Sequence, residues 1–186
     1  LTLLAGNDII FSSGNGVSAT TGKLNLVLTA GAAGDVTIGS AVSLNGGTFT
    51  STGTNFTLQG TGSITAAGAN ITHTGTISIA GNVSLGSGAL VFSGTGYTQS
   101  GGTITAGNTT FTVDSINQSG GNMTASNLSV VADNGNVVLT ATGNAFTNVA
   151  VQDTKSNANV SVTSSTGFTS ATVGSVSGIS TTGTGK

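Results

Sequence analysis

The chain has 186 residues, 31 of them Gly, and only 4% are charged, with a net charge of −2. The absence of Cys excludes disulfides and thiolate chemistry, and a single histidine, His73, argues against a multi-histidine metal site or a Ser-His-Asp triad. Three Lys and no Arg leave no basic surface, so we expect no nucleic-acid partner.

The apolar residues are expected to be buried in regular secondary structure. Mean hydropathy is +0.30, whereas disordered chains combine low hydropathy with high charge. Proline, which is common in disordered linkers, is absent. The sequence has no run of 18 apolar residues, and residues 1–20 show no signal peptide. We therefore expect an ordered chain that does not insert into a membrane.

Short strands are predicted along the chain, beginning with residues 1–4 (LTLL). Each later unit alternates polar and apolar side chains over about four residues, and clusters of Gly, Asn or Ser-Gly separate the units. The clearest pairs of units are 46–50 with 55–58, 62–66 with 70–72, 101–105 with 110–113, and 120–124 with 127–130. No segment has a 3.6-residue period, so we expect no α-helix.

The spacing of these units predicts a three-faced parallel β-helix. From Phe49 to Leu128, twelve steps between apolar centres cover 79 residues, and three such steps give about 20 residues. A 20-residue period also links Leu4, Leu24, Leu44, Ile64 and Ile104. Residues 1–186 would then form one segment of about nine coils. A sandwich or barrel needs longer strands with wider turn spacing.

The predicted core consists of the apolar centres that point inward. Between residues 150 and 157 we expect a loop that leaves the rod before Val160 resumes it, and the register is uncertain after residue 150. The core residues are Leu24, Leu44, Phe49, Phe56, Ile64, Ile71, Leu90, Ile104, Phe111, Met123 and Leu128.

Several segments resemble the shaft repeats of filamentous haemagglutinin-like exoproteins. They are residues 1–9 (LTLLAGNDI), 24–30 (LNLVLTA) with 34–38 (GDVTI), and 44–50 (LNGGTFT). The resemblance covers most of residues 1–150. It implies a right-handed parallel β-helix that Gram-negative bacteria secrete through an outer-membrane transporter, the two-partner route. Such proteins act as adhesins, biofilm matrix proteins or shafts that carry a toxin.

Three kinds of function are open. The first is a non-catalytic structural and adhesive shaft on the bacterial cell surface, which contacts glycans or proteins of a cell or matrix. The second is a self-assembling extracellular filament, whose subunits stack end to end through unpaired terminal strands. The third is a carbohydrate- or ice-binding module that uses a face rich in Thr, Asn and Ser. The Thr-x-Thr motifs wander among the faces, which disfavours ice binding.

Asn-x-Ser/Thr sequons are the most frequent candidate modification sites. Because Asn favours corners and Thr favours the start of a strand, the repeat itself also generates this pattern. The eight sequons begin at Asn55, Asn70, Asn82, Asn108, Asn117, Asn122, Asn127 and Asn159.

The remaining polar candidates predict no catalytic site, cofactor or metal. Asp114 and Asp133 are 19 residues apart and would be neighbours on one face, the sole carboxylate pair of note. Asp8 and Asp35 follow corners that contain Gly, which favours a turn or capping role. His73 is expected to be half-exposed at the end of a strand, and Tyr97 takes a core position.

Overall fold

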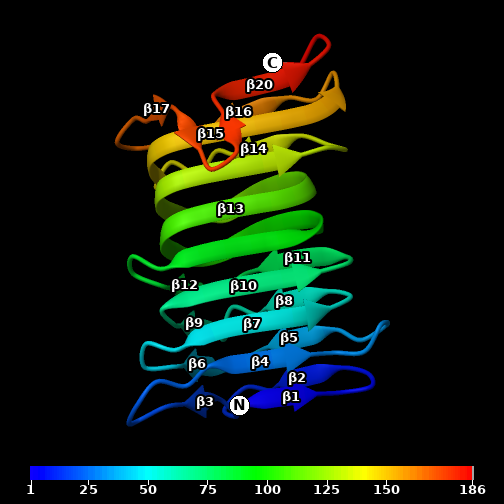
Figure 1. The fold of residues 1–186 in the computed structure, drawn as a ribbon, viewed down its shortest axis with the longest axis vertical. Helices are drawn as coiled ribbons and strands as arrows, with labels where there is room; N and C mark the ends of the chain where they lie inside the picture. Colours follow the sequence, from blue (N-terminus) through cyan, green and yellow to red (C-terminus); the bar gives the residue numbers. More distant parts are fainter. Residues whose placement is uncertain (186) are drawn as a thin grey trace.

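The computed structural model describes residues 1–185 and is an all-β parallel solenoid (Figure 1). It has about eight turns of about 21 residues and no helix in the described part. The predicted fold class is confirmed, with slightly fewer and longer turns than expected. The right-handed sense stays a prediction from the resemblance. No helix in residues 1–185 is suited to crossing a membrane.

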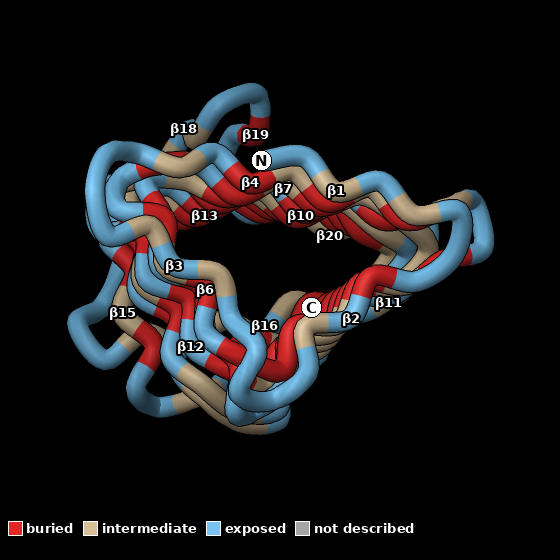
Figure 2. Tube along the Cα trace, turned by 90° about the horizontal axis from the view of Figure 1, so that it is seen from below, coloured by how far each residue is buried: buried red, intermediate tan, exposed pale blue. Residues whose placement is uncertain are grey.

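Three faces surround the core, here named A, B and C (Figure 2). Face A begins with β1 (Thr2–Leu4), β4 (Leu26–Thr29), β7 (Thr48–Gly53) and β10 (Gly68–His73). Face B contains β2 (Ile9–Phe11), β5 (Val36–Ile38), β8 (Phe56–Leu58), β11 (Thr76–Ile79), β14 (Val137–Leu139) and β16 (Val160–Val162). Face C begins with β3 (Val17–Ser18), β6 (Ala41–Ser43), β9 (Ser63–Thr65) and β12 (Asn82–Ser84).

Longer strands continue the faces through the upper half of the rod. β13 (Ala89–Ala132) pairs in turn with β10, β11 and β12, so it bends around all three faces. β15 (Ala145–Ser156) runs along the end of β13, and β17 (Thr169–Ser170) and β20 (Ile179–Thr182) pair with β15. The one antiparallel pair of the described part is β18 (Thr172–Val173) with β19 (Val176–Ser177).

The pairing register of the strands explains which predicted core residues are buried and which are not. All of the predicted core residues except Leu24 are buried. Leu24 is partly buried, and Leu4 of the same expected column is 75% exposed. The first turns are long, since Ile9 pairs with Val36. Loop residues added in these turns break the 20-residue period at the N-terminal end.

Aromatic side chains fill the middle of the rod. Phe111 lies 5.2 Å from Phe92 and 4.7 Å from Tyr97, measured between ring centroids. All three rings are at most 1% exposed. Tyr97 is therefore a core residue, and burial raises the pKa of its hydroxyl.

At the corners between faces the chain must turn sharply, and its backbone N–H groups still need hydrogen-bond acceptors. Gly102 has φ 66°, and a Cβ there would collide with the backbone of Gly81 on the turn below. At another corner Asp8, Asp35 and Asn55 each accept a backbone N–H from the next turn through Oδ1. These bonds give Asp8 and Asp35 the capping role that the sequence predicts.

The C-terminal region differs from the prediction. Residues 150–156 form no loop, because β15 continues to Ser156 and pairs with β13 and β20. The chain resumes in β16 at Val160, as expected. The segment that leaves the rod is the β18–β19 hairpin, which stands outside face A (Figures 1 and 2).

Candidate functional site

A ladder of asparagines lies on the outer surface of face A. Asn148 donates from Nδ2 to Asn127 Oδ1 at 2.8 Å, and Asn127 donates from Nδ2 to Asn108 Oδ1 at 2.7 Å. The three residues occupy successive turns, because strand pairing stacks residues about 21 apart. Alternation directs them outward, since Leu128 beside Asn127 is fully buried.

The β18–β19 hairpin arches over this ladder. Its base is tied to β15 by backbone bonds from Ala171 N to Val149 O (3.1 Å) and from Val151 N to Gly178 O (2.8 Å). Val176 is 3% exposed and anchors the hairpin on the rod. At the tip, Gly174 has φ 61° and permits a tight turn.

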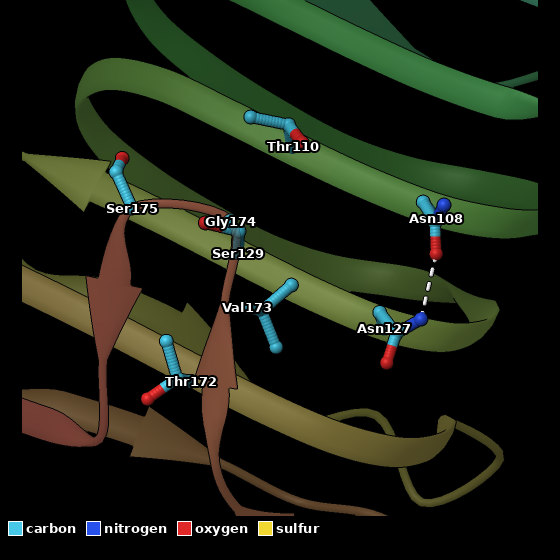
Figure 3. Close-up of a pocket in the computed structure, with 8 residues that line it drawn as sticks. All are labelled: Asn108, Thr110, Asn127, Ser129, Thr172, Val173, Gly174 and Ser175. Carbon is cyan, nitrogen blue, oxygen red and sulfur yellow. Dashed lines mark hydrogen bonds between the residues drawn. The ribbon is translucent and has the colours of Figure 1, made fainter.

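A groove with a volume of about 420 Å³ lies between the hairpin and face A. Strand β13 supplies one side, and the hairpin supplies the other (Figure 3). None of the residues that line the groove is charged. They are Asn108, Thr110, Asn127, Ser129, Thr172, Val173, Gly174 and Ser175. Sequence reasoning missed this groove, because nothing in the repeat indicates that residues 172–177 fold back over the turns that contain residues 108–129.

Four of the eight sequon Asn residues make hydrogen bonds at corners or in the ladder. At corners, Asn55 and Asn82 use Oδ1 to accept a backbone N–H from the next turn. Asn108 and Asn127 belong to the ladder, and Asn127 is only partly exposed beneath the hairpin. The other four are exposed: Asn70, Asn117, Asn122 and Asn159. The corner bonds show that Asn at two sequons has a structural role, and glycosylation itself stays a prediction.

Outward hydroxyl groups are more regular than the sequence suggests. On face C, strand pairing aligns Ser18, Ser43, Thr65, Ser84 and Thr105 in one column. The prediction that Thr positions wander among the faces concerned Thr alone, and Thr occupies only two of these five positions, Thr65 and Thr105. Ser occupies the other three positions, so the column presents methyl groups at only two of its five steps.

The structure places the predicted carboxylate pair at one hollow of the surface. Asp114 and Asp133 line the same shallow hollow on adjacent turns. Asp153 is 1% exposed; burial raises the pKa of its carboxyl, which accepts a hydrogen bond from Lys155 N. Residues 1–185 contain no group of three or more His, Asp, Glu or Cys side chains placed to hold a metal ion.

His73 is a buried residue, not the half-exposed one that we predicted. It is 4% exposed, its Nε2 lies 3.0 Å from Ser51 Oγ, and its ring packs 5.5 Å from the Phe56 ring. Burial lowers the pKa of the imidazole to about 4, although Asp35 acts in the opposite direction. The prediction failed because His73 closes a strand whose inner side faces the core.

Acid is expected to destabilise the protein through His73. Between pH 6.5 and about 4 the unfolded chain binds a proton at this imidazole and the folded chain does not. The free energy of unfolding should therefore fall as pH drops through this window, by up to about 3 kcal/mol from this group. Urea unfolding at several pH values measures the effect, and His73→Leu should remove this part of the pH dependence. An unchanged dependence in His73→Leu would contradict the assignment.

A second buried polar cluster holds amide side chains at the corner between faces B and C. Gln118 donates from Nε2 to Gln99 Oε1 and to Asn144 Oδ1, both at 3.0 Å, and accepts from Asn144 Nδ2 at 2.7 Å. All three are at most 5% exposed. The sequence analysis missed this cluster. The available signal was the register of the repeat, which places Gln99 opposite Ile79, a core position.

No family model, curated protein or solved structure matches this chain.

Proposed function

We propose that the chain is a structural and adhesive shaft segment of a secreted bacterial surface protein and has no catalytic role. The observation that supports this most is continuous parallel pairing along one axis, from Thr2 on β1 to Thr182 on β20. Each turn contacts its neighbours, so such a rod extends by adding turns. A rod of this kind holds an attached domain at a distance from the cell.

The composition of the surface fits an extracellular rod. Only 4% of residues are charged, and the outward columns carry Ser, Thr and Asn. These side chains hydrogen-bond to glycans or to proteins of a cell or matrix. Residues 1–9, 24–30, 34–38 and 44–50 resemble shaft repeats of filamentous haemagglutinin-like exoproteins. This resemblance supports secretion through an outer-membrane transporter and a role in adhesion or biofilm.

Immunogold labelling of intact cells tests this proposal. Antibodies raised against the purified chain are applied to Gram-negative cells that produce the native protein and to an isogenic deletion strain. We expect label outside the outer membrane of the producing cells and lower attachment of the deletion strain to epithelial monolayers or to plastic. Label found only inside permeabilised cells, with equal attachment of both strains, would contradict the proposal.

A second candidate function is an extracellular filament whose subunits stack end to end. The large hydrophobic residues that are exposed all lie on the first or last turns: Leu1 (55%), Leu4 (75%), Ile10 (60%), Phe168 (37%) and Ile179 (42%). A second copy stacked on the last turn would cover Ile179, which lies in register with the fully buried Val151. Leu4 and Ile10 lie in register with Thr29 and Thr37 and point outward from faces A and B, so stacking would not cover them. Growth of the sedimenting species with protein concentration distinguishes this candidate from an isolated shaft segment.

A further inference from the structure

The groove between face A and the β18–β19 hairpin has no part in the shaft role. We propose that it binds a neutral oligosaccharide, which lies along the asparagine ladder of Asn108 and Asn127 beneath the hairpin. This inference rests on the adhesive part of the proposed function and names its ligand class and its site.

Size and shape permit such a ligand. A volume of about 420 Å³ lies within the range of small-molecule sites, about 300–1,000 Å³. The hairpin makes the site two-sided, whereas the rest of face A presents only an outer sheet surface (Figure 2). Successive turns repeat at about 4.8 Å, a spacing comparable to the length of one pyranose unit. A sugar chain can therefore meet equivalent polar groups on successive turns.

The chemistry of the lining selects a neutral polyol. Asn amides and Ser or Thr hydroxyls offer both donors and acceptors, which match the hydroxyl groups of a sugar. No charged side chain lines the groove to compensate an ionic ligand. Val173 projects from β18 on the side of Asn127 and gives an apolar surface for the C–H groups of a sugar ring (Figure 3).

Several polar groups in the groove retain hydrogen-bonding capacity. Within the described chain, the ladder uses Asn108 only as an acceptor, which leaves its Nδ2 as a donor. Ser129 is 6% exposed, and residues 1–185 provide no hydrogen bond to its Oγ. Alternation directs Ser129 outward, because Leu128 and Val130 on either side are fully buried. Ser129 thus lies almost entirely covered at the bottom of the groove with an open donor and acceptor.

The test is a titration of the ¹⁵N-labelled chain, followed by NMR, with maltotetraose, cellotetraose, chitotetraose and galactotetraose in turn. We expect at least one sugar to give saturable shifts at the Asn108 and Asn127 side-chain amides. Asn108→Ala should weaken binding about threefold to tenfold, the effect of one hydrogen bond. Thr110→Tyr should abolish binding, because a large side chain on the groove floor fills the space.

Asn70→Ala is the matched control. Asn70 is an exposed residue on face A, outside the groove, and should leave the affinity unchanged. Circular dichroism and the melting temperature establish that each variant keeps the fold. The proposal is overturned if none of the four sugars gives saturable shifts, if the shifts map outside the groove, or if Thr110→Tyr binds as wild type.

Discussion

Phe111→Asp is expected to unfold the central turns of the rod. Phe111 is fully buried and packs against Phe92 and Tyr97. Loss of a buried Phe destabilises a core by about 3–5 kcal/mol, and an unpaired polar group adds a further penalty of about 1–3 kcal/mol. The sum is comparable with the whole stability of many domains, about 5–15 kcal/mol.

Far-UV circular dichroism and hydrogen exchange measure this result. In a solenoid each turn depends on its neighbours, so loss of protection should spread from residue 111 toward both ends. Asn117→Asp is the control, since Asn117 is exposed on face B and pairs with Val138. This substitution should change stability by less than about 0.5 kcal/mol. If Phe111→Asp keeps the melting temperature of the wild type, the assignment of Phe111 to the core is wrong.

The period of apolar residues was sufficient to predict the fold. In a solenoid each strand pairs with the equivalent strand of the neighbouring turn, so the spacing of the apolar residues along the sequence gives the length of one turn. Phe49 with Ala69 and Val83 with Ile104 follow this rule, with steps close to the predicted one. Leu4 does not, because loops in the first turns displace the register. A periodic average cannot locate such loops.

The period of apolar residues did not predict the groove beneath the hairpin, for a different reason. The groove depends on a hairpin at residues 172–177 that packs on turns far earlier in the chain. The burial of Val176 and the backbone bonds to Val149 and Val151 set the position of the hairpin. The hairpin does not follow the repeat of the strands on which it packs, so the repeat does not predict these contacts. The ladder partners Asn108 and Asn127 were found as sequons, but their contact required the register.

The buried amide cluster shows how a polar residue can replace an aliphatic one in a core column. Gln99 lies in register with Ile79, which lies in register with Leu58. At this corner the amides also serve the backbone: Ala141 N donates to Gln118 Oε1 at 3.2 Å, and Met123 N donates to Asn144 Oδ1 at 2.8 Å. An aliphatic side chain would fill the space but leave these N–H groups without an acceptor.

Gln118→Leu is therefore expected to destabilise the protein although it increases apolar burial. The change removes the acceptor of Ala141 N and both bonds to Asn144, and each buried polar group left unpaired costs about 1–3 kcal/mol. We expect a loss of about 3 kcal/mol in urea unfolding. Gln152→Leu, at an exposed position, is the control and should have little effect. A Gln118→Leu variant as stable as wild type would mean that aliphatic packing alone suffices at this corner, and that the amide cluster contributes no net stability.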